Sequence, residues 1–181
     1  MDSVFAPWRI EWVERDGSDD VEGCVFCALP TGETDRDSLV VARNDHAYVV
    51  LNNYPYNPGH VMVIPDVHEG DYEALSAAVL LAHSRLTQQT IEALKDALNP
   101  DGVNAGLNLG GSAAGGSIDD HLHTHVVPRW SGDTNFMPVV AETKVIVEAL
   151  EDTYERLHES FADLDDAEST DEDAAVTLEF K

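Results

Sequence analysis

Three histidines alternate with other residues in the segment His121-Leu122-His123-Thr124-His125. Successive side chains of a β-strand point to opposite faces, so a strand over residues 121–127 would place the three imidazoles on one face. Three imidazoles make a poor apolar core, because each ring nitrogen needs a hydrogen-bond partner. Such a face suits either metal ligation by neutral nitrogens or nucleophilic and acid–base catalysis near neutral pH.

A loop rich in glycine, serine and alanine comes directly before this segment. Its sequence over residues 108–117, NLGGSAAGGS, offers backbone N–H groups that few side chains obstruct. Such groups are suited to binding phosphate oxygens. Arg129 follows the strand and either adds positive charge to this region or pairs with the acidic surface.

The two cysteines of the chain, Cys24 and Cys27, form a C-x-x-C pair. A disulfide does not suit a cytosolic protein, and a redox motif would need a βαβ context that the sequence lacks. A tetrahedral zinc site would need two further ligands. Two small buried thiols without a metal are the simplest alternative.

The spacing of apolar residues predicts the elements that position these groups. Short apolar runs predict strands, and a helical period predicts two helices. The strands cover residues 39–42, 47–51, 61–65, 103–109 and 121–127, and the helices cover 71–98 and 142–161. This order predicts an α+β fold with a mostly antiparallel sheet of about five strands, one long helix and one C-terminal helix.

We expect three parts along the 181 residues. Residues 1–22 form an N-terminal arm, in which Trp8 and Trp12 are spaced by one helical turn. Residues 23–161 form the catalytic domain. Residues 162–181 are rich in carboxylates, which predicts a disordered acidic tail.

The charge balance limits the classes of partner. With 10 basic and 35 acidic residues, the net charge is −25. Such a field opposes binding to nucleic acid and to anionic membranes. The beginning of the chain does not resemble a signal peptide, so we expect a cytoplasmic protein. A strongly acidic, lysine-poor surface also suggests a halophilic cell, in which salt screens the self-repulsion.

Two sequence blocks carry a resemblance to a known family. The segment HLHTHVV resembles the His-φ-His-φ-His-φ-φ signature of the histidine-triad superfamily, where φ is an apolar residue. The segment PGHVMVIP, over residues 58–65, is similar to the second family block. Together with NNYPYNPGH and HLHTHVVPRWSGDTNF, these segments most resemble the branch that acts on diadenosine polyphosphates, which includes phosphorylases.

The resemblance implies a HIT-like fold, a homodimer and an enzyme that cleaves a nucleotide at its α-phosphate. His123 would be the nucleophile and would form a nucleotidyl-histidine intermediate. The implied catalytic residues are His123, His125, His60 and His121. The implied nucleotide-binding residues are Asn52 at the ribose and Asn108, Gly116 and Ser117 at the phosphates. Trp130 either closes over the substrate, the role we favour, or packs on the fold. We expect the strand over residues 48–51 to line an apolar slot for the base; for Val49 and Val50 a plain core role is the alternative.

The resemblance also completes a zinc site. Its ligands would be Cys24, Cys27, His68 and His121, with His46 as the alternative fourth ligand. The zinc would be structural, and no organic cofactor is expected.

Several alternatives stay open at the level of sequence. Many hydrolases of the family carry a glutamine where this chain has Ser117, so hydrolysis and phosphorolysis are both open. A metal-dependent hydrolase could instead use the histidine cluster as ligands. A nucleotide-binding module without turnover is the third interpretation.

Overall fold

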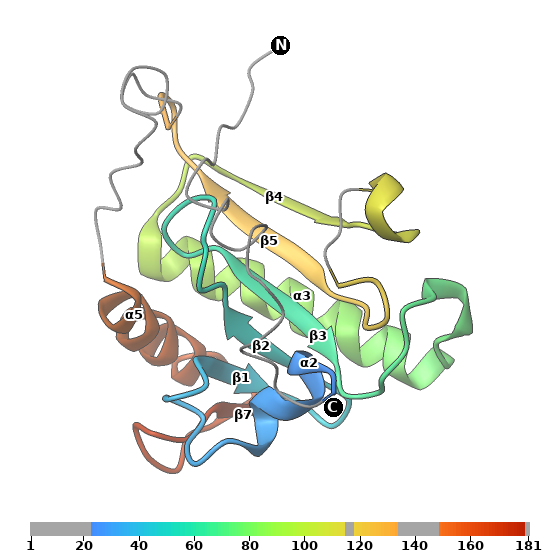
Figure 1. The fold of residues 1–181 in the computed structure, drawn as a ribbon. Helices are drawn as coiled ribbons and strands as arrows, with labels where there is room; N and C mark the ends of the chain where they lie inside the picture. The colour runs from blue at the N-terminus through green and yellow to red at the C-terminus, as the bar shows by residue number, and fades with distance from the viewer. Residues whose placement is uncertain (1–22, 115–117, 134–148, 180–181) are drawn as a thin grey trace.

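The computed structural model describes residues 23–114, 118–133 and 149–179. These residues form an open sheet of seven strands in the order β4-β5-β3-β2-β1-β7-β6. The helices α3 and α5 pack side by side behind the sheet, and the short α2 lies on the opposite face (Figure 1). The predicted α+β class is confirmed, although the sheet has two strands more than expected.

Antiparallel pairing dominates the sheet. The strands are β1 (Val40–Arg43), β2 (Ala47–Leu51), β3 (Val61–Pro65), β4 (Gly102–Leu107), β5 (Thr124–Arg129), β6 (Ala167–Glu168) and β7 (Val176–Leu178). Among the strands of the described residues, only β1 and β7 pair in parallel. The strand β5 pairs with β3 on one side and with β4 on the other. The strand β3 begins directly after His60.

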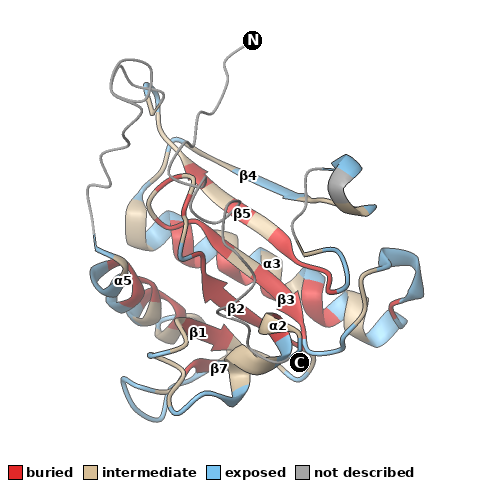
Figure 2. Cartoon of the chain, in the orientation of Figure 1, coloured by how far each residue is buried: buried red, intermediate tan, exposed pale blue. Residues whose placement is uncertain are grey.

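Both faces of the central strands are buried (Figure 2). Along β2, Val49 and Leu51 pack in the cluster shared with α3 and α5, whereas Tyr48 and Val50 pack in the cluster shared with Phe26 of α2. This alternation follows from the two-residue period of a strand. It places Phe26 on the face away from the long helices.

The long helix begins later than the predicted residue 71, and residues 142–148 of the predicted closing helix lie outside the described residues. The long helix α3 (Ala77–Leu98) begins after Ser76, whose side chain accepts a hydrogen bond from Val79 N, and ends at Asn99 with a φ of 46°. Residues before it form the short 3-10 helix η4 (Tyr72–Ala74). The closing helix α5 is Leu150–Ala162. The shorter elements are α2 (Val25–Ala28), η3 (Leu29–Thr31) and η5 (Gly111–Ala114).

The predicted catalytic strand begins later than expected. We predicted a strand over residues 121–127, but β5 starts at Thr124 and continues to Arg129. His125 therefore lies within the sheet, whereas His121 and His123 precede it. Pro128 is tolerated because β3 pairs with β5 only as far as Val126, so this part of the strand has a neighbour on one side.

The predicted disordered tail is wrong for residues 163–179. Val176 and Leu178 are almost fully buried and belong to β7, which pairs with β1 through Ala42 and Val176. The alternation of buried and exposed residues in β7 is that of an ordinary strand, hidden in the sequence by the carboxylates before it. The folded part of the chain therefore extends beyond the boundary at residue 161 and includes the C-terminal strands.

The N-terminal arm, including Trp8 and Trp12, lies outside the described residues. Within the described part of the chain, no helix is long and apolar enough to cross a membrane.

Candidate functional site

The ring of His123 is oriented by the backbone just before it. Its Nδ1 lies 3.0 Å from the carbonyl oxygen of His121. Because a carbonyl oxygen only accepts, Nδ1 must carry the proton and donate it. In the neutral ring, the lone pair is then on Nε2. His123 is buried in the chain, so this hydrogen bond fixes the orientation of the ring and the position of Nε2.

A pair of histidines, His60 and His125, lies beside His123. The Nε2 of His60 and the Nδ1 of His125 are 3.0 Å apart, and the backbone N–H of Tyr56 donates to Nδ1 of His60 at 3.1 Å. The Tyr56 ring stacks on His60 with the centroids 4.7 Å apart. Since Nδ1 of His60 is an acceptor, the neutral His60 ring carries its proton on Nε2 and donates it to His125.

The hydrogen bond between these two rings also determines which nitrogen of His125 carries the proton. Its Nδ1 accepts from His60, so the neutral ring carries its own proton on Nε2. The rings of His123 and His125 have centroids 5.0 Å apart at an angle of 82°. In their neutral forms the two rings therefore place a nitrogen lone pair of His123 beside an N–H donor of His125, an arrangement that can serve covalent catalysis with a hydrogen bond to the leaving group.

The fourth predicted catalytic histidine, His121, belongs to a different cluster. Its Nε2 lies 2.8 Å from the carbonyl oxygen of Pro65, and its Nδ1 lies 3.3 Å from Sγ of Cys24 and 3.6 Å from Sγ of Cys27. Burial lowers the pKa of His121, which favours the neutral ring. The Nε2–H that points to Pro65 leaves Nδ1 as the ligand atom.

The four predicted zinc ligands converge. Ligand atoms of Cys24, Cys27, His68 and His121 all lie within 4.8 Å of one another, and Sγ of Cys27 is 3.4 Å from Nδ1 of His68. Tetrahedral zinc with bonds of about 2.3 Å to sulfur and about 2.0 Å to nitrogen needs sulfur–nitrogen separations of about 3.5 Å. The residues present therefore fit a zinc ion. His46, the alternative ligand, is not part of this group.

Phe26 connects the two clusters, a link that the sequence analysis missed. It lies between the two cysteines, and its ring centroid is 5.6 Å from that of His121 and 5.0 Å from that of His123. Its carbonyl oxygen accepts the Tyr48 hydroxyl at 2.5 Å. The segment that carries the two thiols therefore also packs the Phe26 ring against His123.

The predicted nucleotide-binding residues are placed in part. Gly116 and Ser117 lie outside the described residues. Asn108 directly follows Leu107, which pairs with Thr124, and in the antiparallel register the next position on β5's side is His123. Asn52 is buried at the end of β2 and accepts the Tyr54 N–H.

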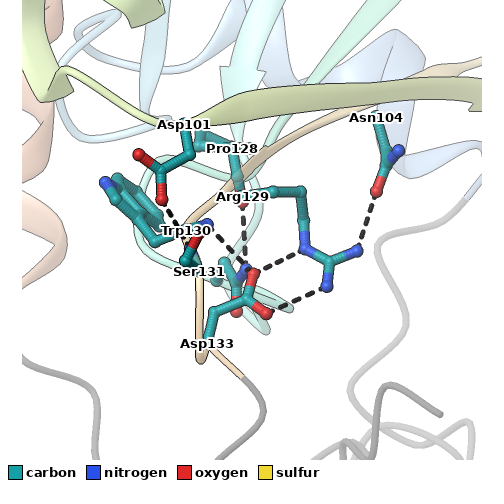
Figure 3. Close-up of polar contacts among 8 residues, drawn as sticks. Asp101, Asn104, Pro128, Arg129, Trp130, Ser131 and Asp133 are labelled. Carbon is teal, nitrogen blue, oxygen red and sulfur yellow. Dashed lines mark hydrogen bonds and ion pairs between the residues drawn. The ribbon is translucent and has the colours of Figure 1, made fainter. Parts of the chain in front are cut away.

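Residues 48–51 of the predicted base slot are buried, and Val50 packs in the same cluster as Phe26. Trp130 is half-buried in the turn after β5, where its backbone N–H donates to Asp133 (Figure 3).

The charge of Arg129 is compensated rather than available to a phosphate. Its guanidinium donates from Nε and Nη2 to Asp133 at 2.6 and 2.9 Å, and from Nη1 to Asn104 at 2.8 Å (Figure 3). The sequence analysis left both roles open, and the geometry assigns the ion pair. It did not identify Asp133 or Asn57, which donates to Asp133 across 76 positions of sequence.

Known proteins resemble this chain in sequence. The family model of the HIT domain matches residues 33–132. The AP-4-A phosphorylase of Mycobacterium tuberculosis is 46% identical over 158 residues, which are 84% of this chain and 80% of that protein.

Solved structures give the same result for the fold. A zinc-bound histidine triad family protein from Mycobacterium smegmatis matches with a TM-score of 0.64 and 26% identity, over 79% of this chain and 96% of that one. A histidine triad nucleotide-binding protein from Sulfolobus tokodaii matches with a TM-score of 0.63 and 26% identity, over 79% and 95%. The chain therefore belongs to the histidine-triad family.

Proposed function

We propose that this protein is an enzyme that cleaves diadenosine polyphosphates at an α-phosphate, with His123 as the nucleophile. The hydrogen bond from His123 Nδ1 to the His121 carbonyl carries the proposal, because it leaves the lone pair on Nε2. The 46% identity to a protein named AP-4-A phosphorylase supports the class of substrate.

The reaction would have two steps. In the first, Nε2 of His123 forms a bond to the α-phosphorus, the bond from phosphorus to the bridging oxygen breaks, and that oxygen leaves as a phosphate anion while it accepts a hydrogen bond from Nε2–H of His125. In the second, an oxygen of inorganic phosphate or water attacks the phosphorus, the phosphorus–nitrogen bond breaks and returns the lone pair to Nε2 of His123, and a proton carried by the attacking oxygen passes to the solvent. Two moderate barriers replace one high barrier, which is the advantage of a covalent intermediate.

The second substrate decides the products, and the relative's name favours phosphate. With diadenosine tetraphosphate, phosphorolysis yields ADP and ATP, whereas hydrolysis yields AMP and ATP. We expect ADP to appear only when phosphate is added. Chromatography of the products with and without phosphate separates the two reactions.

The nucleophile is tested by trapping. Acid quenching with substrate labelled in the adenosine should recover labelled protein from the wild type and from His46→Gln, a control because His46 belongs to neither histidine cluster. His123→Gly should bind nucleotide but lose turnover by at least about a thousandfold, with no label on the protein. Near-normal turnover in that variant would refute the assignment.

The same experiment separates the two alternatives. A metal-dependent hydrolase would stop at once when a chelator is added and would give no labelled protein. A binding module would bind nucleotide without a burst of product. Both ring nitrogens of His60 are occupied, by the Tyr56 N–H and by His125, which disfavours a metal held by His60; for His123 the chelator and the trapped label decide.

We also propose a structural zinc ion at Cys24, Cys27, His68 and His121. The convergence of the four ligand atoms supports it, and the ion would tie the segment that carries Phe26 to the residue before the catalytic strand. Metal analysis of protein purified without chelator should find about one zinc per chain, and Cys27→Ser should lose it. A metal-free wild type with normal stability would contradict the site.

The remaining features are proposed from the sequence. We propose that the protein is a cytoplasmic homodimer, as the family resemblance and the sequence suggest. We also propose that it is adapted to a salt-rich cell, because the net charge of −25 requires screening. Sedimentation should give twice the mass of the chain, and the melting temperature should rise between low and molar salt. A melting temperature independent of salt would contradict the adaptation.

A further inference from the structure

One carboxylate organises the turn that follows β5. Asp133 accepts hydrogen bonds from the guanidinium of Arg129 and from the backbone N–H of Trp130 at 3.2 Å (Figure 3). Its side chain is only 12% exposed, and the hydrogen bond from Arg129 is the main cause that lowers the pKa of Asp133 to about 2. Asp133 is therefore a fixed negative charge at neutral pH.

The same carboxylate reaches a distant loop. The side-chain amide nitrogen of Asn57 donates to Asp133 at 2.8 Å and to the Pro128 carbonyl oxygen at 3.0 Å. Both partners only accept, so the orientation of this amide is determined. Asn57 is buried, and these two bonds attach its loop to the turn after β5.

That loop encloses His60. The backbone carbonyl of Asn57 accepts the backbone N–H of His60 at 3.0 Å. Tyr56, the residue before Asn57, donates its backbone N–H to Nδ1 of His60. If the Tyr56–His60 turn moved, the N–H donor at Nδ1 would be lost. The His60 ring could then carry its proton on Nδ1, and Nε2 would become an acceptor toward His125.

We infer that Asp133 is a positioning residue that acts through Asn57 and the Tyr56–His60 turn to hold the proton of His125 on Nε2. The inference rests on the proposed function, in which that N–H donates a hydrogen bond to the leaving oxygen. With His60 in the other tautomer, Nδ1 of His125 would have to donate to it, and Nε2 would lose the proton that assists departure. Asp133 itself need not touch the substrate.

The structure supplies a matched control that contacts the same turn. Asp101, just before β4, accepts the backbone N–H of Ser131 at 2.6 Å (Figure 3). Asp101→Asn and Asp133→Asn each remove one charge that binds this turn, but Asp133→Asn also removes the acceptor that links the turn through Asn57 to His60. Differences between the two variants therefore report on that link.

Two substrates test the role of the proton. The leaving oxygen of a phenyl ester of adenosine monophosphate is strongly basic and depends on an N–H donor for stabilisation, whereas a p-nitrophenyl ester releases a stable anion. We expect Asp133→Asn to lower kcat by about tenfold or more on the phenyl ester and by less than about threefold on the p-nitrophenyl ester, with little change in KM. Asp101→Asn should stay within about twofold of the wild type on both.

Ring spectra give a readout that does not depend on turnover. Long-range proton–nitrogen correlation spectra distinguish the two tautomers of each histidine. The wild type and Asp101→Asn should hold His60 with its proton on Nε2, and Asp133→Asn should populate the other form. If Asp133→Asn does not fold, Asp133→Glu, which keeps the charge but displaces the carboxylate, should give smaller changes in the same direction.

The outcomes separate the inference from the proposed function. Equal losses on both esters, or unchanged ring spectra in Asp133→Asn, would overturn the positioning role. A wild type that cleaves neither ester and forms no labelled protein would overturn the proposed function, while the spectra would still decide the role of Asp133.

Discussion

Gly59, the residue before His60, lies where the chain leaves no room for a side chain. Its φ is +75°, a left-handed conformation that disfavours any residue with a Cβ. A Cβ there would also overlap the side chain of Leu98 and lie 3.2 Å from Cγ of Pro128 and 3.3 Å from Cδ2 of Leu94. We therefore expect Gly59→Ala to destabilise the fold through two separate effects.

The size of each effect follows from its cause. The left-handed backbone costs about 1–2 kcal/mol for alanine. Overpacking costs about 1–3 kcal/mol; the end of the Leu98 side chain can rotate away, but Leu94 is fully buried and the Pro128 ring is rigid. We expect a total loss of about 3 kcal/mol in the free energy of unfolding.

Two other glycines separate the effects. Gly110 has a φ of +98° with nothing within 4 Å of an added Cβ, so Gly110→Ala should show the backbone cost alone. Gly102 has neither a left-handed φ nor a close neighbour, so Gly102→Ala should be neutral or slightly stabilising. Urea unfolding at one temperature compares the three variants. Equal losses in Gly59→Ala and Gly110→Ala would refute the packing argument, and no loss in either would refute the backbone argument.

Three further substitutions test other parts of the structure. Tyr48→Phe removes the donor to the buried Phe26 carbonyl and should cost about 1–3 kcal/mol in urea unfolding. Burial lowers the pKa of His83, so below a pH of about 6.5 the unfolded chain binds more protons than the folded one and stability falls on acidification. His83→Gln should reduce the slope of the unfolding free energy against pH by at most about 1.4 kcal/mol per pH unit. An unchanged slope would contradict this. Asn99 ends α3 with a φ of 46°, so Asn99→Ala should cost about 1 kcal/mol and Asn99→Gly should not, as thermal melts can check.

Much of the candidate site was predictable because its residues carry local signals. The alternation around His123, the glycine before His60 and the C-x-x-C pair are each visible within a few residues. The convergence of Cys24 and Cys27 with two histidines came from the family resemblance, not from spacing, since nothing local links residues so far apart. The structure brings these ligand atoms together as expected.

The link from Asp133 to Asn57 had no such signal. It joins two loops that are 76 positions apart, and a single hydrogen bond leaves no periodic pattern in a sequence. Both residues are of types common in turns, so their composition indicates only loops. The carboxylate became meaningful only when its neighbours in space were known.

The C-terminal strands were missed for a related reason. The strand β7 has three residues and lies just after a run of carboxylates, so averaging over a window gives a solvated segment. Its burial depends on pairing with β1, which is more than 130 positions earlier, and on the hydrogen bond from Ala175 N–H to Asp35. Composition describes a segment alone, whereas a strand is stabilised by its neighbours.

The late beginning of β5 matters more than a shifted boundary usually does. In a strand over residues 121–127, the ladder hydrogen bonds would compete for the carbonyl of His121. Because β5 begins at Thr124, that carbonyl accepts Nδ1–H of His123, while the ring of His121 turns to the thiols. Two residues of one alternating segment thus serve different clusters, and the tautomer of the proposed nucleophile depends on backbone that the sheet leaves unpaired.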